Sequence, residues 1–320
     1  MWRADFQTAY DMLGARISEE AERFSFLLNS DRLTRSQKIK FEKLLNENFE
    51  KSSVLCGSLR LLTEVLNRHY GVPALVLIDE YDVPLDKAYQ AGYYQQMIHL
   101  IRSLFSQALK TNPNMYFAVI TGCLQIARES IFTGLNNFKV RSISSADCAE
   151  YFGFTDSEVR EMMEYYGVGE RFPDMKEWYD GYHFGNMDVY CPWDVVSQCD
   201  ILRGSKDAAM EPHWVNSSNN VILRDILKNA TEAVKAEIEM LISGEIIEKE
   251  IMPELTYTDL ESQEVKIRQT YLWSVLYAAG YLTDAGKPNG RIHRLTIPNK
   301  EVLGMYEEKI RSWFKVLEVQ

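Results

Sequence analysis

Two adjacent acidic residues, Asp79 and Glu80, come directly after the uncharged apolar run Ala74–Ile78. A carboxylate in such a place can hold a divalent cation, and a second one beside it can orient or deprotonate a water molecule. Continuous apolar runs are typical of strands in parallel sheets, whose ligands bind outside the carboxyl ends of the strands. The pair is therefore the first candidate for a functional site. Two solvated acids that open a turn are the structural alternative.

A second apolar run, Met115–Ile120, ends at Thr121 and Gly122. If both runs are strands of one parallel sheet, the Thr121 hydroxyl lies beside the two acids and can sense a phosphate group. An apolar strand that ends in Asp-Glu is the Walker-B pattern of P-loop NTPases. There the Asp holds the magnesium ion on the phosphates, and in ATPases the next acid orients the attacking water. A Thr followed by Gly is also common in ordinary turns, so Thr121 alone does not establish a phosphate-binding site.

Other polar residues near these runs have two interpretations each. Arg128 is a candidate for contacting a γ-phosphate, because a guanidinium group binds phosphate oxygens in a bidentate fork. An ion pair with Glu129 or a neighbouring helix is its structural alternative. Asp82 and Asp86 could extend the acids into a two-metal nuclease site. Since the neighbouring strand carries no charge, solvated turn acids are the preferred interpretation.

The stretch WYDGYHFG, residues 178–185, combines aromatic rings with Asp180 and His183. We interpret it as a packed, hydrogen-bonded corner rather than a ligand pocket. No Ser or Cys at a recognisable nucleophile elbow accompanies His183, which argues against a hydrolase triad. Ser217 and its neighbours are interpreted as a helix cap.

The composition excludes several classes of protein. With 320 residues, of which 46% are hydrophobic, the chain can form one large domain or two ordinary ones. The formal net charge of −11 argues against direct binding to nucleic acid. Five cysteines without a C-x-x-C pair indicate reduced, mostly buried thiols rather than a zinc site. No apolar run reaches the roughly 18 residues of a membrane span, and no targeting peptide is visible, so we expect a cytoplasmic protein.

Hydrophobic spacing predicts the elements that position these residues. We expect amphipathic helices over residues 6–28, 35–50 and 53–70, the second begun by a capping box of Thr34 and Gln37. A strand, a turn at Val83-Pro84, a helix and a second strand then form a βαβ unit. Further on we expect a short strand at 139–143, a capping box of Thr155 with Glu158, a helix over 219–243 and a hairpin turn at 289–290.

Several sequence blocks, in this order, closely resemble the bacterial AAA-ATPase-like family: VLIDEYDVPLDKAYQAGYY, ITGCLQIARESIFTGLNN, YFGFTDSEV, WYDGYHFG, PHWVNSSNN and IPNKEV. The resemblance runs from about residue 20 to the end. It implies an α/β parallel-sheet P-loop NTPase core (AAA-like) over residues 1–145, followed by a mainly helical lid region over 146–320. Members of the family usually continue into a PD-(D/E)XK nuclease-like domain, which we expect to be missing here.

Family members also carry a Walker-A loop, and no G-x-x-x-x-G-K-[ST] motif occurs in these 320 residues. We therefore expect an incomplete core that lacks its phosphate-binding loop and leaves a strand edge unpaired. Such an edge invites pairing with the missing segment, with a partner chain or with a second copy.

The resemblance implies ATP and Mg²⁺ as ligands, with Asp79 at the metal, Glu80 orienting water, Thr121 sensing the γ-phosphate and Arg128 contacting it. ATP hydrolysis by the chain alone is expected to be impaired or absent. The alternative is a non-catalytic interaction or regulatory module derived from an ATPase core.

Overall fold

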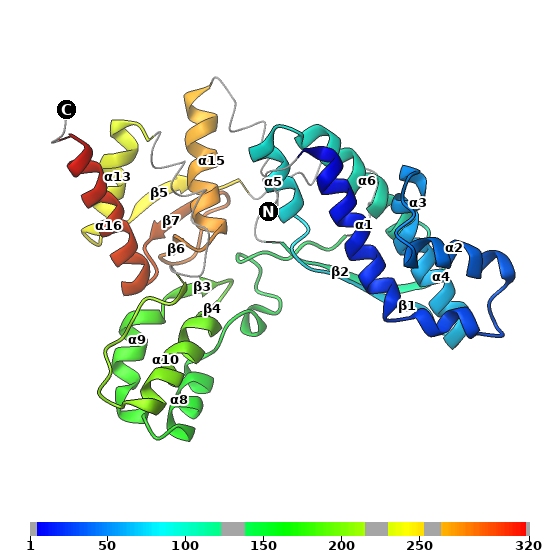
Figure 1. Ribbon diagram of the computed structural model, residues 1–320. Coiled ribbons are helices and arrows are strands. Elements are labelled where there is room, and N and C mark those ends of the chain that lie inside the picture. The colour runs from blue at the N-terminus through cyan, green and yellow to red at the C-terminus, as the bar shows by residue number, and fades with distance from the viewer. Residues whose placement is uncertain (1–4, 123–137, 215–229, 253–263, 318–320) are drawn as a thin grey trace. The chain divides into compact units, whose positions relative to one another are not determined.

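The computed structural model describes residues 5–122, 138–214, 230–252 and 264–317 (Figure 1). These residues form two compact units, one up to Phe138 and one from Lys139 onward, and each is described by itself. The boundary predicted after residue 145 stays a prediction. No helix in the described ranges is both long and apolar enough to cross a membrane.

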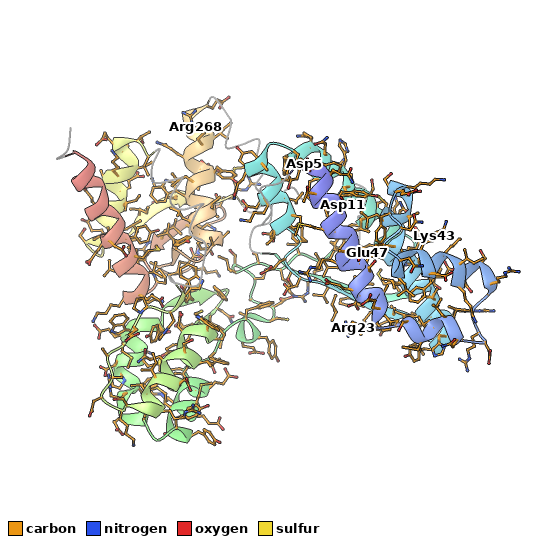
Figure 2. The ribbon with its side chains drawn as sticks, viewed as in Figure 1. Asp5, Asp11, Arg23, Lys43, Glu47 and Arg268 are labelled. Atoms are coloured by element: carbon orange, nitrogen blue, oxygen red, sulfur yellow. The ribbon has the colours of Figure 1, made fainter. Side chains whose placement is uncertain are left out.

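Unit 1 combines helices with one small sheet. Its elements are α1 (Phe6–Glu22), η1 (Ser25–Asn29), α2 (Arg35–Leu45), α3 (Ser52–Cys56), α4 (Ser58–Tyr70), β1 (Ala74–Ile78), α5 (Val83–Ala91), α6 (Tyr94–Leu109) and β2 (Met115–Ile120). The side chain of Asp5 begins α1 by accepting a hydrogen bond from the Thr8 backbone N–H at 2.9 Å (Figure 2). The expected capping box of Thr34 and Gln37 is present at the start of α2.

The predicted βαβ unit is confirmed. Strands β1 and β2 pair in parallel, with Leu75 opposite Phe117 and Ile78 opposite Ile120. Helices α5 and α6 make the connection between them. Because paired residues of parallel strands point to the same face, the register fixes which side chains share a surface.

One face of this sheet is exposed in unit 1, although continuous apolar strands are typical of parallel sheets that are covered on both faces. Val76 is 8% exposed, whereas its neighbours Leu75 and Leu77 are 64% and 74% exposed. Their partners on β2, Phe117 and Val119, are 60% and 43% exposed. We call these four side chains the apolar sheet face. Both faces of the β1-β2 sheet are therefore apolar, but unit 1 covers only the face that carries Val76.

Four predicted boundaries in unit 1 were wrong. The helix expected over 35–50 ends at Leu45. The first helix ends at Glu22 and is followed by the short 3-10 helix η1. The helix expected over 53–70 is divided at Gly57 into α3 and α4. The expected turn at Val83-Pro84 is instead the first turn of α5, because proline is readily accommodated there.

Unit 2 begins with helical segments and ends with a small antiparallel sheet. Its elements are η2 (Ala149–Tyr151), α8 (Asp156–Tyr165), η3 (Gly169–Arg171), α9 (Phe172–Tyr179), β3 (Tyr182–Phe184), β4 (Met187–Val189), α10 (Pro192–Gly204), α13 (Glu232–Ile242), β5 (Ile247–Glu250), α15 (Val265–Ala278), β6 (Thr283–Asp284), β7 (Ile292–Thr296) and α16 (Lys300–Leu317). The three-stranded sheet has the order β5-β7-β6.

Two hydrophobic cores lie in unit 2. One is built around α8, α9 and α10 and contains Met163, Tyr179 and Val195. The other joins α13, α15, α16 and the β5-β7-β6 sheet and contains Trp273 and Tyr306. We call them the α10 core and the α16 core.

The predictions for unit 2 had mixed outcomes. The capping box of Thr155 and Glu158 begins α8, and β6 and β7 form the expected antiparallel pair around Asn289-Gly290. Residues 139–143 are not a strand. Helix α10 was not anticipated, because its Pro192 start lies in a stretch that reads as turns. The helix expected over 219–243 is described only from Glu232, and its earlier part lies outside the described residues.

Candidate functional site

The carboxyl ends of β1 and β2 bring Asp79 and Thr121 together. The backbone N–H of Thr121 bonds to the carbonyl of Ile78 at 2.9 Å, which continues the ladder past the last strand residue. The Thr121 hydroxyl donates a hydrogen bond to Oδ1 of Asp79. Two residues far apart in the sequence thus form one polar group at the strand ends, where ligands of parallel sheets bind.

Glu80 has an unusual backbone conformation beside this pair. Its φ angle is 52°, in the left-handed region that residues other than glycine seldom adopt. Its backbone N–H donates to Oδ1 of Asp79 at 3.0 Å, and the N–H of the next residue, Tyr81, bonds to the Thr121 carbonyl at 3.0 Å. This conformation ends β1 abruptly and leaves the Glu80 side chain in solvent. Strained backbone of this kind gathers at functional sites.

Gly122 allows the chain to pack tightly behind the two acids. A Cβ atom at this position would lie 2.7 Å from Cε1 of Tyr81 and 2.7 Å from Oδ1 of Asp82. Both neighbours are buried, at 9% and 5% exposed. Burial, with the Asp82 charge as a second cause, raises the pKa of the Tyr81 phenol, which therefore stays protonated. The glycine is required by this close approach.

The acids predicted as a group separate into two environments. Asp79 and Glu80 are exposed, together with Thr121. Asp82 is buried as the residue before α5, and Asp86 contacts Lys87 at 3.5 Å and Gln90 at 2.8 Å. Within the described ranges, no set of three or more His, Cys, Asp or Glu side chains is arranged to hold a metal ion. A multi-acid nuclease site therefore has no support in this region.

The remaining sequence candidates lie elsewhere. Arg128 falls outside the described residues, so its predicted contact with phosphate stays a prediction. In the 178–185 stretch, Tyr179 is fully buried, and its hydroxyl bonds to Gln198 and to the Glu211 carbonyl. His183 contacts Asp188 across the β3-β4 hairpin at 2.8 Å. The interpretation as a packed corner is confirmed for Tyr179. The cap expected at Ser217 lies outside the described residues.

Cys56, Cys148, Cys191 and Cys199 are free thiols, of which Cys56 and Cys199 are buried. Sequence reasoning missed two buried acids of unit 2, Asp194 in the first turn of α10 and Glu301 in the first turn of α16. An acid at a helix start shortly after a proline is their sequence signal, and that pattern is common at exposed helices too.

The βαβ unit with acids at the strand ends defines an α/β protein whose site belongs to a parallel sheet. Residues 3–132 match the family model described as "Predicted AAA-ATPase". The resemblance to the AAA-ATPase-like family is thereby confirmed over these residues, and this region is an ATPase-like domain in the general sense.

The chain is 24% identical over 247 residues to the "Uncharacterized protein in vnfD 5'region" of Azotobacter chroococcum mcd 1. The aligned part covers 75% of this chain but 43% of that protein, so the chain spans less than half the length of this relative. No solved structure matches the chain.

Proposed function

We propose that unit 1 carries the cation and water-activating half of an Mg²⁺–ATP hydrolysis site. The observation that supports this proposal most is the hydrogen bond between Thr121 and Asp79 at the ends of two neighbouring parallel strands. It places a carboxylate and a hydroxyl together at the edge where parallel sheets receive phosphate ligands. The match of residues 3–132 to an ATPase family supports the same ligand.

The donor set fits magnesium. Mg²⁺ prefers oxygen ligands, keeps several waters and is often held by one or two carboxylates together with substrate phosphates. The exposed Asp79 carboxylate offers such a ligand, with room for water around it. When bound, the cation would neutralise charge on the phosphate oxygens. A solitary carboxylate is sufficient for this mode of binding, in which the nucleotide supplies the other ligands.

Thr121 would respond to occupation of Asp79. Its hydroxyl has one proton, which it now donates to the Asp79 carboxylate. A cation on that carboxylate makes the oxygen a poorer acceptor, so the Thr121 proton becomes available to a γ-phosphate oxygen. We therefore assign Thr121 as the γ-phosphate sensor, coupled to the cation through Asp79.

Glu80 is the residue we assign to orient the attacking water. Its left-handed backbone turns the side chain away from the sheet and into solvent, immediately beside the carboxylate at the cation. A carboxylate there can accept a proton of a water molecule held for in-line attack. Arg128 keeps its predicted role of contacting the phosphate, which would stabilise the charge that develops there.

Tight nucleotide binding requires a phosphate-binding loop, and these 320 residues contain no G-x-x-x-x-G-K-[ST] motif. We propose that a further segment or a partner chain, including a second copy, supplies it. The two-stranded sheet supports this view, since parallel sheets are normally covered on both faces and the apolar sheet face lies open in unit 1. An added strand and helix could cover that face and deliver the loop. The site needs access to ATP, which fits the expected cytoplasmic location.

The exposed sheet face also favours one alternative function. A cluster of Leu75, Leu77, Phe117 and Val119 on one surface is what a protein-binding module displays. In that case the ATPase core would serve contact or regulation without catalysis, and neither Asp79 nor Glu80 would affect its activity.

Glu80→Gln distinguishes the two functions. Phosphate release from ATP by the purified chain with magnesium should be slow, and the substitution should reduce it to background, because the amide cannot accept the proton of the attacking water. Asp86→Asn is the matched control, since the Asp86 carboxylate contacts Lys87 and Gln90. Equal phosphate release from wild type and Glu80→Gln would reject the catalytic function and favour the interaction module.

A further inference from the structure

Two arginine side chains of unit 1 hydrogen-bond to backbone carbonyls around the end of α4. Nη1 of Arg32 donates to the carbonyl of His69 at 2.8 Å, and Nε of Arg68 donates to the carbonyl of Arg32 at 3.1 Å. His69 lies in the last turn of α4, so the Arg32 guanidinium satisfies a carbonyl that has no partner within the helix. The two bonds hold both arginines at one place on the surface.

These bonds use only part of the donor capacity of the two arginines. A guanidinium group has five N–H donors, and both side chains are exposed. None of the ion pairs between described residues includes Arg32 or Arg68. Their structural role therefore occupies one donor of each group, and both positive charges remain available to an anion.

Aromatic rings lie beside these arginines. His69 packs edge-to-face against Phe26 of η1, with ring centres 5.6 Å apart, and against Tyr70, with ring centres 4.8 Å apart. The His69 ring is also fixed by a hydrogen bond of 2.8 Å between its Nδ1 and the Ser30 hydroxyl. Phe26 is 43% exposed and Tyr70 is 54% exposed, so both rings are held by His69 and still have surface open to solvent. We call this group the basic aromatic corner: Phe26, Arg32, Arg68, His69 and Tyr70.

The local charge at this corner is positive, although the whole chain is acidic. Residues 31–38 and 64–70 carry four cations and two carboxylates. One of the carboxylates, Glu64, accepts a hydrogen bond from Gln37 at 2.8 Å, which joins α4 to α2. The formal charge of −11 belongs to all 320 residues, whereas charges more than about 8 Å apart are largely screened at physiological salt. The corner can therefore attract an anion that the chain as a whole would repel.

Arg35 adds a third cation close to the corner. It is the first residue of α2, where the capping box of Thr34 and Gln37 fixes the backbone. Its Cα is three residues from that of Arg32 and therefore at most about 11 Å away. The Arg35 side chain is exposed and is part of none of the ion pairs between described residues. Three arginines thus lie close enough to contact neighbouring phosphates of one strand.

Cations beside exposed rings favour single-stranded nucleic acid over other anions. Arginines bind the phosphates, and unpaired bases stack on aromatic side chains, which bases inside a duplex cannot do. A membrane surface would require an apolar helix face that can insert, but α2 buries Phe41 and Leu44 completely. An acidic protein would use the charges but would not require the open rings of Phe26 and Tyr70.

We propose that the basic aromatic corner, together with Arg35, binds single-stranded nucleic acid. The arginines hold phosphates, and the rings of Phe26 and Tyr70 stack on bases, contacts that DNA and RNA can both make. Tyr70 precedes β1 whereas Asp79 follows it, so the corner lies at the other end of this strand from the nucleotide site proposed above. Binding at the corner does not depend on that site.

Fluorescence anisotropy of a labelled oligothymidylate of about 16 nucleotides tests the phosphate contacts. With three such contacts, the affinity of the wild-type chain should fall about 20-fold between about 50 and 200 mM salt. Arg68→Gln removes one contact, so its affinity should fall only about sevenfold over the same range. Arg16→Gln is the matched control, because Arg16 is exposed on α1 and pairs with Glu19 at 2.6 Å. It should keep the salt dependence of the wild type.

Substitution of Tyr70 tests the stacking contact. Tyr70→Ala should weaken binding of the single strand at least about fivefold, the low end for the loss of one stacked base, whereas Tyr70→Phe should bind like the wild type. Tyr165→Ala is the control, because it removes an exposed tyrosine from α8 in unit 2 and should have no effect. A duplex of the same length should bind more weakly than the single strand and should not respond to Tyr70→Ala.

No binding of the single strand by the wild-type chain at about 50 mM salt would overturn the proposal. An unchanged salt dependence in Arg68→Gln, or unchanged affinity in Tyr70→Ala, would overturn it as well. Tighter binding of the duplex would show attraction to phosphate without stacking and would also contradict it. If Arg68→Gln does not fold, Arg35→Gln provides the same comparison and should reduce the salt dependence equally.

Discussion

The Thr121 hydroxyl donates a hydrogen bond to the Asp79 carboxylate, joining the ends of two parallel strands that α5 and α6 separate in the sequence. The same Asp79 oxygen accepts the Glu80 backbone N–H. One oxygen of the Asp79 carboxylate therefore receives two donors, which hold the carboxylate at the ends of both strands. The proposed roles of all three residues depend on this arrangement.

Substitution of Thr121 tests whether its hydroxyl senses the γ-phosphate. Thr121→Ala removes the hydroxyl, so the preference of the chain for ATP over ADP should fall by about tenfold, the value of one hydrogen bond to a charged group. Thr121→Ser keeps the hydroxyl and should keep the preference. The measurement is competitive binding of the two nucleotides with magnesium. An unchanged preference in Thr121→Ala would show that this hydroxyl does not sense the γ-phosphate.

The left-handed backbone at Glu80 predicts a gain in stability when the side chain is removed. Glu80→Gly should raise the free energy of unfolding by about 1 kcal/mol, because glycine adopts this conformation without a Cβ clash. Urea denaturation measures the effect. Glu47, labelled in Figure 2, has a φ of 51° after α2, and Glu47→Gly is the matched control. It should stabilise similarly without changing phosphate release, whereas a destabilised Glu80→Gly would argue against strain at the site.

Exposure of the apolar sheet face predicts that substitutions at Leu77 and at Val76, adjacent residues of β1, change the free energy of unfolding by different amounts. Leu77→Thr should leave the free energy of unfolding within about 0.5 kcal/mol of wild type, because the Leu77 side chain is exposed and threonine suits a strand. Val76→Ala, on the covered face, should cost about 1–3 kcal/mol. Self-association, followed by light scattering, should decrease in Leu77→Thr. A large destabilisation by Leu77→Thr would mean that the chain already covers this face.

Local sequence signals predicted the residues of the candidate site, but they did not predict the exposure of the apolar sheet face. The apolar runs at 74–78 and 115–120 located both strands, and the parallel connection placed Thr121 beside Asp79. The two apolar runs could not show that one face of the sheet is exposed. Leu75 and Val76 are chemically alike, although only Val76 is buried. Burial depends on what packs against the strand.

The backbone conformation at Glu80 and the burial of charged side chains could not be predicted from the sequence, because both depend on contacts with distant residues. The sequence around Glu80 does not require a positive φ, which accompanies the hydrogen bond of its own backbone N–H to Asp79 and that of the Tyr81 N–H to Thr121. Asp194 and Glu301 are both buried in the first turn of a helix, and neither local sequence pattern indicates this burial. Helix caps such as Thr155 with Glu158 were predictable because all their atoms lie within one turn.

Calorimetric titration of the purified chain with Mg²⁺–ATP, beside Asp79→Ala and the control Asp86→Asn, tests the central claim most directly. We expect weak binding, with a dissociation constant of about 0.1–1 mM, because the sequence has no Walker-A motif to hold the phosphates. Binding should be lost in Asp79→Ala and retained in Asp86→Asn. Equal binding by wild type and Asp79→Ala, or no binding by the wild-type chain at millimolar nucleotide, would contradict the assignment of Asp79 and Thr121 as half of an ATP site.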